Sequence, residues 1–190
     1  MSESQQKPQE KVEVKEVKGC GRLFKRLFLG SRLDDKLIDE VLSGNSDGVK
    51  NLILQGASVD SRDALGTTAL MLACDLNYFN IVSLLISKNA NVDLSNSLGL
   101  TALHYAVKKQ DLRVVRLLVN SNEGDLEKRI NKRDEKGNTP LHYAVEVGNI
   151  DVVDFLIKRK ANKFIENNEK HIPLDIARKK QFFEMINLLK

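Results

Sequence analysis

Residues 137–144 read GNTPLHYA, and close copies of this eight-residue sequence recur along the chain. GTTALMLA begins at Gly66, GLTALHYA begins at Gly99 and KHIPLDIA begins at Lys170. The four copies start at residues 66, 99, 137 and 170, so the intervals are 33, 38 and 33 residues and one interval carries five extra residues. A nearly constant period of this length indicates a stack of similar structural units.

The copies at residues 66, 99 and 137 have the residue types that begin a helix, and the copy at residue 170 keeps only the proline, with Lys170 and Ile172 in place of the glycine and the threonine. The glycines suit a turn that needs a positive φ, and a threonine then stands where a helix N-cap is expected. An alanine or a proline follows the threonine and suits the first helical position. The expected N-caps are Thr68, Thr101 and Thr139, and the two prolines of this kind are Pro140 and Pro173.

A second helix is expected in each unit, eight to thirteen residues after the alanine that ends the eight-residue sequence. Apolar residues there follow an i, i+1, i+4, i+5 pattern, which produces a wide apolar stripe on one helix face. A stripe of this kind has to be covered by the neighbouring unit. Its members are Ile81, Val82, Leu85, Ile86, Val114, Val115, Leu118, Val119, Val152, Val153, Leu156, Ile157, Met185, Ile186 and Leu189.

The period and its T-P-L-H-x-A core resemble the ankyrin repeat. The resemblance covers residues 33–190 and implies an all-α solenoid of helix-turn-helix units with β-hairpin loops. The first and last units depart from the repeated sequence, so we expect them to be caps. The five extra residues fall within about 120–128, where a polar loop is expected to bulge out. The expected units are 33–65, 66–98, 99–136, 137–169 and 170–190.

The resemblance also implies structural roles for residues that would otherwise suggest chemistry. His104 and His142 occupy the histidine position of the repeat, which implies a hydrogen bond to the backbone of the neighbouring hairpin. Cys74 occupies a position that the family fills with a small residue, so we expect a buried and unreactive thiol. His171 falls alone on an expected hairpin, without a cysteine or carboxylate at metal-ligand spacing.

The resemblance places a partner-binding surface on the hairpin tips and on the exposed side of each first helix. Four leucines at such positions, Leu65, Leu76, Leu98 and Leu100, need not be apolar for folding, so they suggest an apolar contact zone for a partner. Scattered surface leucines without a role are the alternative. The remaining candidate binding residues are the basic rim of Lys108, Lys109 and Lys136, together with Val147.

The residues before the repeats divide into two parts. Residues 1–18 are charged and poor in apolar residues, and we expect them to be disordered. Residues 19–32, GCGRLFKRLFLGSR, contain no acid and indicate a short basic amphipathic helix. This segment could pack over the first repeat, lie on an anionic membrane with Cys20 as an acylation site, dock on a partner through Lys25-Arg26-Leu27-Phe28, or serve in targeting such as nuclear import. Its apolar face begins with Leu23 and Phe24.

Charge is unevenly distributed along the chain. Residues 1–36 have nine basic and six acidic side chains, residues 37–98 have three and seven, and residues 99–190 have eighteen and thirteen. A partner with the opposite charge gradient would be steered onto such a stack. In the repeats the basic residues are interleaved with acids and aromatic residues make up 5% of the chain, so nucleic-acid binding is not expected.

No phosphate-binding loop, nucleophile elbow or zinc-protease motif occurs in the sequence. We therefore expect a non-enzymatic protein without cofactor or metal, and the resemblance implies an adaptor or scaffold that binds another protein as a monomer. A scaffold tethered to a membrane by residues 19–32 and an inhibitory subunit of an enzyme are the alternatives. The charged N-terminus lacks an apolar signal segment, so a cytoplasmic location is expected, with membrane association or the nucleus as alternatives.

Overall fold

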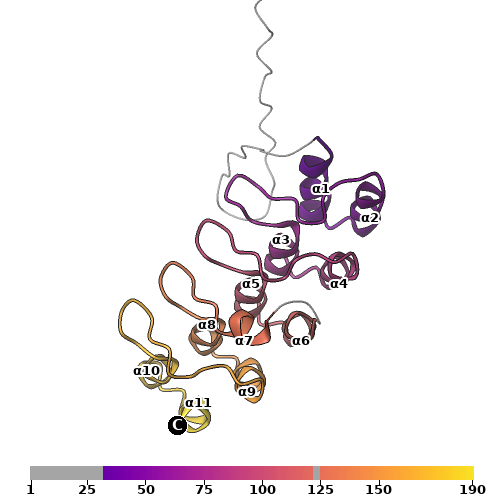
Figure 1. Cartoon of the computed structure of the whole chain (residues 1–190). Coiled ribbons are helices and arrows are strands. Elements are labelled where there is room, and N and C mark those ends of the chain that lie inside the picture. The colour runs from indigo at the N-terminus through magenta and orange to yellow at the C-terminus, as the bar shows by residue number, and fades with distance from the viewer. Residues whose placement is uncertain (1–31, 122–124) are drawn as a thin grey trace, which may run out of the picture.

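The computed structural model describes residues 32–121 and 125–190, and over these residues the protein is an all-α stack (Figure 1). Two rows of helices run along the stack, and each helix of the inner row precedes its partner in the outer row. The inner row consists of α1 (Arg32–Ser43), α3 (Ala69–Asp75), α5 (Ala102–Lys108), α8 (Pro140–Val147) and α10 (Pro173–Lys179). The outer row consists of α2 (Ser46–Leu54), α4 (Phe79–Ser87), α6 (Leu112–Asn120), α9 (Ile150–Lys158) and α11 (Phe183–Leu189).

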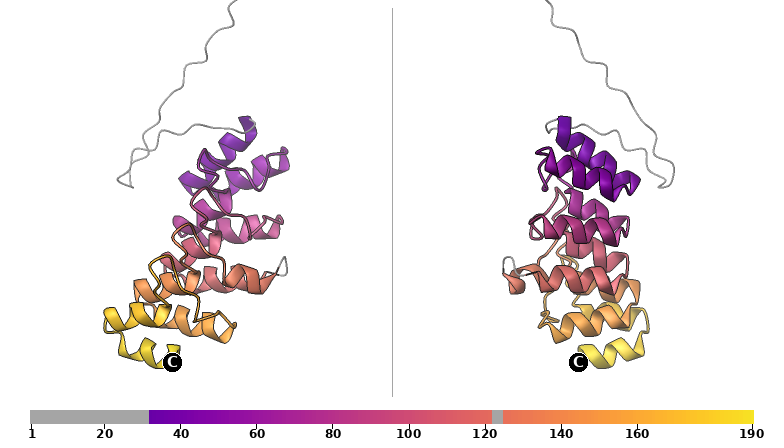
Figure 2. Two further views of the ribbon diagram at one scale, coloured as in Figure 1. Left: turned by 60° about the vertical axis from the view of Figure 1, so that its left-hand side comes forward. Right: turned by 90° about the vertical axis from the view of Figure 1, so that its right-hand side faces the viewer.

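The helix pairs lie one above another as layers, which the side views of Figure 2 show. Most of the expected outer-helix stripe is buried in the space between layers; Ile86, Ile157 and Ile186 are only partly buried. Leu85, Leu118 and Leu156 have no exposed surface at all. Each pair therefore buries its apolar face against the next pair, as the resemblance implies. No helix of the described residues is long and apolar enough to cross a membrane.

Four loops connect the pairs and project to the same side of the stack (Figure 1). We call them the first to fourth hairpins, residues 55–68, 88–101, 131–139 and 159–172. Their turns have the positive φ that the sequence predicts, with 72° at Gly66, 71° at Gly99 and 76° at Gly137. Lys170 adopts the same conformation in the fourth hairpin, with φ 64°, although it has a side chain.

The repeated histidines connect one unit to the next, which confirms the structural role expected for them. The backbone N–H of Thr101 donates to Nδ1 of His104 at 3.1 Å, and Thr139 does the same to His142 at 3.1 Å. Because Nδ1 accepts a hydrogen bond, the proton of the neutral ring lies on Nε2. Nε2 of His104 donates to the carbonyl oxygen of Asn138 at 3.3 Å, and Nε2 of His142 donates to that of His171 at 3.1 Å.

Burial makes these rings hard to protonate. Both side chains are almost fully buried, and the loss of solvent lowers the pKa of His104 to about 4 and also lowers the pKa of His142. A protonated ring would also present a hydrogen at Nδ1 to the N–H group that now donates to it. The neutral form is therefore the one that joins the repeats.

A short helix, α7 (Leu126–Ile130), occupies part of the segment that the sequence predicts to be a bulging loop. The expectation of a loop throughout 120–128 is wrong, because the polar stretch contains its own helix start. The side chain of Asp125 accepts hydrogen bonds from the N–H groups of Glu127 and Lys128 at 3.0 and 3.3 Å. Ile130 at the other end of α7 is buried.

Arg129 holds α7 against the rest of the stack, and its side chain is almost fully buried. Nε and Nη2 donate to the two carboxylate oxygens of Asp93 at 2.6 and 3.1 Å. Nη1 donates to the carbonyl oxygens of Leu118 and Ser121 at 3.1 and 3.2 Å. Because the last carbonyl groups of a helix have no partner within it, Arg129 takes the place of water at the end of α6.

The free energy of unfolding should depend on pH through His104. The unfolded chain binds a proton at His104 below pH 6.5, whereas the folded chain does so only near pH 4. The stability that the neutral His104 contributes is therefore fully present above pH 6.5 and is lost as the pH falls toward 4. We expect His104 to lower the free energy of unfolding by about 2 kcal/mol between pH 7 and pH 5. Urea titrations of the protein and of His104→Gln measure this contribution as the difference between their pH dependences.

His142→Gln is the companion variant, because burial lowers the pKa of His142 as well. It too should reduce the pH dependence of the unmodified protein. Equal pH dependences for the His104→Gln variant and the unmodified protein would contradict the role given to the buried ring.

The second prediction concerns Arg129. Arg129→Met removes the guanidinium donors from the carboxylate of Asp93 and from the carbonyl oxygen of Ser121, so it should lower the free energy of unfolding by about 2 to 3 kcal/mol. Lys128→Met, at the neighbouring exposed side chain, should change it by less than about 0.5 kcal/mol. Thermal and urea unfolding of both variants test this difference, and equal losses would disprove the anchoring of α7 by Arg129.

Candidate functional site

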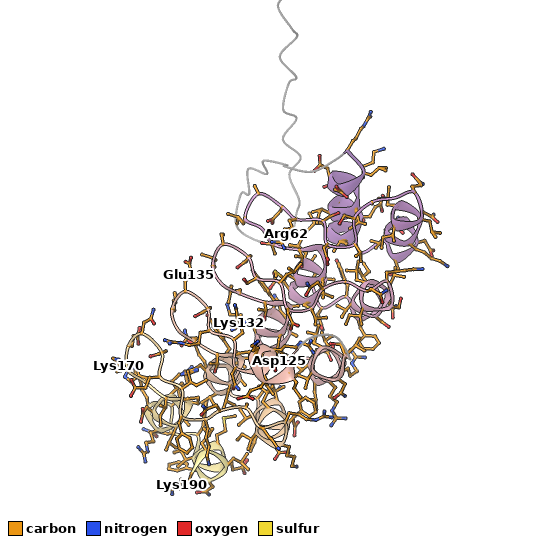
Figure 3. All side chains as sticks on the ribbon, viewed as in Figure 1. Arg62, Asp125, Lys132, Glu135, Lys170 and Lys190 are labelled. Carbon is orange, nitrogen blue, oxygen red and sulfur yellow. The ribbon has the colours of Figure 1, made fainter. Side chains whose placement is uncertain are left out.

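The tips of the four hairpins form a continuous row, because the backbone of each tip is bonded to the next. The N–H of Ser97 donates to the carbonyl oxygen of Leu65 at 2.9 Å. The same bond recurs from Glu135 to Leu98 and from Asn168 to Lys136, each at 3.0 Å. Figure 3 labels Arg62 at the base of the first hairpin, Glu135 on the third hairpin and Lys170 on the fourth. Neighbouring side chains on the tips are thus held at a fixed separation.

Each tip is also held from within by one short polar side chain. Oδ1 of Asp63 accepts from the N–H groups of Leu65 and Thr67, both at 2.9 Å. Equivalent side chains accept the equivalent bonds in the other three hairpins. These residues are Asn96, Asp134 and Asn167, and each lies three positions before the positive-φ residue.

The sequence contains a signal for the role of these four residues, which is their constant spacing before the turn. An aspartate or asparagine at a constant distance before the turn is typical of a side chain that bonds to its own backbone. The regular geometry of the tips therefore comes from the same repeat as the helices do.

The structure separates the leucines that were expected to lie together on the surface. Leu65 and Leu98 are 44% and 51% exposed, and both are on hairpin tips. Leu100 is only 6% exposed and belongs to the core, so its place among the candidate binding residues is a mistake. Leu100 lies two residues before α5, where the chain turns back into the stack. Leu76 and Val147, at the ends of α3 and α8, are partly buried.

Two of the three lysines of the expected basic rim already make contacts within the protein. Nζ of Lys108 lies 4.4 Å from the centre of the Tyr143 ring, a cation–π contact with the next unit. Nζ of Lys109 lies 3.2 Å from a carboxylate oxygen of Asp75 in the previous unit. Lys136 is exposed on the third tip, so among these three lysines it has the side chain most available to a partner.

The inner helices are joined to the hairpins and thereby complete one surface. The hydroxyl of Tyr143 on α8 donates to Oδ2 of Asp134 at 2.6 Å, and burial together with this carboxylate raises the pKa of Tyr143 well above its usual value. Tyr105 on α5 accepts from the amide of Asn96 at 3.0 Å. We call the hairpin tips, together with the C-terminal ends of α3, α5, α8 and α10, the inner surface.

The described residues offer neither a metal-binding cluster nor an exposed thiol. Within 32–121 and 125–190, no three histidine, cysteine, aspartate or glutamate side chains are grouped so that they could hold a metal ion. The thiol of Cys74 is buried, which raises its pKa far above the usual range. Cys20 and the segment Leu23, Phe24, Lys25, Arg26, Leu27 and Phe28 lie outside the described residues.

The stacked helix pairs and the row of hairpins define a helical repeat protein. Comparison with protein families matches residues 37–130 to ankyrin repeats (3 copies) and residues 125–177 to ankyrin repeats (many copies). The chain therefore belongs to the ankyrin-repeat family, which confirms the resemblance seen in the sequence. Ankyrin repeats are generally non-catalytic modules for protein–protein interaction. A comparison with curated proteins found no match.

Proposed function

We propose that this protein is a non-enzymatic adaptor or scaffold that binds another protein through its inner surface, as a monomer inside the cell. The exposure of Leu65 and Leu98 on adjacent tips is the observation that carries this proposal. The tips are bonded to each other and to the inner helices, so little conformational entropy is lost when a partner binds there.

The two leucines have the properties of binding anchors. Each lies on a tip whose conformation is set by Asp63 or Asn96 and the following glycine, so the side chain itself is not needed for folding. A partner that covers a leucine removes its apolar surface from water, which stabilises the complex. The exposed Lys136 on the third tip would act mainly on the rate of encounter.

A membrane-tethered scaffold is the second candidate, and the first helix supplies an observation in its favour. The exposed residues of α1 recur at helical spacing and are polar: Arg32, Lys36, Asp39 and Ser43. The exposed face of α1 at this end of the stack is thus polar, which supports a role for residues 19–31 other than covering an apolar surface. A basic amphipathic segment is suited to an anionic membrane.

Sedimentation with vesicles tests this second candidate. We expect the full chain to bind vesicles that contain phosphatidylserine, and Lys25→Glu combined with Arg26→Glu to reduce the bound fraction at least about tenfold, because each basic residue contributes about 1 kcal/mol. Lys88→Glu combined with Lys50→Glu, which changes two lysines within the stack, is the control. Equal binding by both double variants would contradict tethering by residues 19–32.

The test of the main proposal is a double substitution on the tips. Leu65→Asp with Leu98→Asp should abolish recovery of the cellular partner, because each anchor contributes about 2 kcal/mol to binding. The melting temperature should stay close to that of the unmodified protein, since both side chains are exposed. Pull-down from the protein's own cell extract, followed by crosslinking and mass spectrometry, measures recovery.

Two other apolar side chains give a matched control. Leu54 and Phe183 are 69% and 73% exposed, and neither is on a hairpin tip. Leu54→Asp with Phe183→Asp adds the same charge and should leave recovery intact. If the tip variant recovers its partner as fully as this control, the binding surface lies elsewhere on the stack.

A further inference from the structure

An open hollow of about 560 Å³ lies between Arg133 of the third hairpin and residues 165–170 of the fourth. It lies further along the row of tips than Leu65 and Leu98, on the side toward the C-terminus, where Lys170 is labelled in Figure 3. The hollow is lined by Arg133, Ile165, Glu166, Asn167, Asn168 and Lys170.

The guanidinium group of Arg133 is fixed in place across the two hairpins. Nε donates to the carbonyl oxygen of Gly137 at 3.2 Å, and Nη2 donates to Oδ1 of Asn168 at 3.2 Å. Asn168 is itself held, because its side-chain amide donates to the carbonyl oxygen of Glu135 at 2.9 Å and its N–H donates to that of Lys136 at 3.0 Å. Arg133 is thus oriented before any partner arrives.

Gly137 leaves the space that this bridge occupies. A Cβ at residue 137 would lie 2.5 Å from Nη2 of Arg133, 2.5 Å from Oδ1 of Asn168 and 2.8 Å from the backbone nitrogen of Asn168. Contacts this short are not possible, so a side chain at 137 would displace the guanidinium group. The glycine therefore permits the crossing of Arg133 as well as the turn.

The positive charge of Arg133 is not neutralised by the groups that hold it. Both of its acceptors are neutral oxygens, and no carboxylate of the described residues forms an ion pair with it. Glu166 lines the hollow but lies 3.5 Å from Nζ of Lys170, so these two charges compensate each other. The hollow carries one net positive charge, at Arg133.

The corresponding place between the first and second hairpins has no such bridge. Arg62 takes the position of Arg133 in the first hairpin, but Ser97 takes the position of Asn168 in the second. Among the described residues, no hydrogen bond from the Arg62 side chain to the neighbouring hairpin is present. Arg62 is therefore a natural control for Arg133.

We propose that this hollow is a subsite for a carboxylate side chain of the bound partner. The inference rests on the proposed function, since it places the carboxylate on the same row of tips as the two leucines. Nε and Nη2 of Arg133 each already make one hydrogen bond, whereas Nη1 makes none among the described residues, so the group keeps N–H donors that a carboxylate can accept from. A guanidinium group already fixed in place also loses less freedom on binding than a lysine does. Ile165 provides an apolar wall for the methylene groups of a glutamate or aspartate.

The spacing of the repeats defines where the carboxylate belongs in the partner. Neighbouring helices pack about 10 Å apart, and an extended chain advances about 3.3 Å per residue. Leu65 and Leu98 are one repeat apart, which corresponds to about three residues of an extended partner. The hollow lies between the third and fourth tips, so the acidic residue is about four or five residues beyond the apolar residue that contacts Leu98.

The test uses the full chain and fluorescein-labelled peptides. Each peptide has two leucines three positions apart, and its other residues are glycine and serine apart from one glutamate. In one set of peptides the glutamate lies four or five positions after the second leucine, and in the other set it lies four or five positions before the first. Each has a twin in which glutamine replaces glutamate. In one of the two sets, the glutamate peptide should bind about tenfold more tightly than its twin by fluorescence anisotropy.

Three variants of the protein assign this preference to the hollow. Arg133→Gln removes the charge, and Asn168→Asp places a carboxylate of the same shape on the guanidinium group and neutralises it. Both should bind the two peptides of a pair equally. Arg62→Gln should keep the tenfold preference, and circular dichroism confirms that each variant is folded.

Two results would overturn the subsite: equal or absent binding of both twins in both sets, or a glutamate preference that survives in Arg133→Gln. Either result leaves the proposed function standing if Leu65→Asp with Leu98→Asp still abolishes partner recovery. Conversely, a glutamate preference that depends on Arg133, together with full partner recovery by the leucine variant, supports the subsite and disproves the two leucines as anchors.

Discussion

No helix pair of this chain can bury its own apolar stripe, and the rest of the structure depends on that constraint. A pair of short helices has one face for its partner helix and one face that only the next pair can cover. Leu85, Leu118 and Leu156 are fully buried for this reason. The buried histidines add a polar connection in the same direction, from α5 to the third hairpin and from α8 to the fourth. Each helix pair is therefore stabilised by the pairs next to it.

The helices and their stacking could be predicted because their causes lie within one repeat. The spacing of Thr139, Pro140 and the apolar pairs indicates where each helix begins and which face it buries. That Leu100 is buried could not be predicted from the repeat alone. Leu98 and Leu100 are two residues apart, and the turn at Gly99 directs one into solvent and the other into the core.

Two contacts between residues far apart in the sequence could not be predicted either. Arg129 meets Asp93, which is 36 residues away, and Arg133 meets Asn168, which is 35 residues away. Neither pair recurs in the other repeats, so periodicity contains no signal for them. In contrast, the aspartate and asparagine residues of the tips do recur, at Asp63 and at the equivalent positions, and a search for a constant spacing before the turns would have found them.

The helix α7 shows that chain length and surface spacing are independent in this fold. The five extra residues are accommodated between α6 and the third hairpin, and the bond from Glu135 to Leu98 is as short as the bonds between the other tips. Insertions at that edge can therefore enlarge the protein without altering the order or the separation of the side chains on the tips. Evolution could therefore change the length of the chain at this edge while selection keeps the spacing of the tips constant.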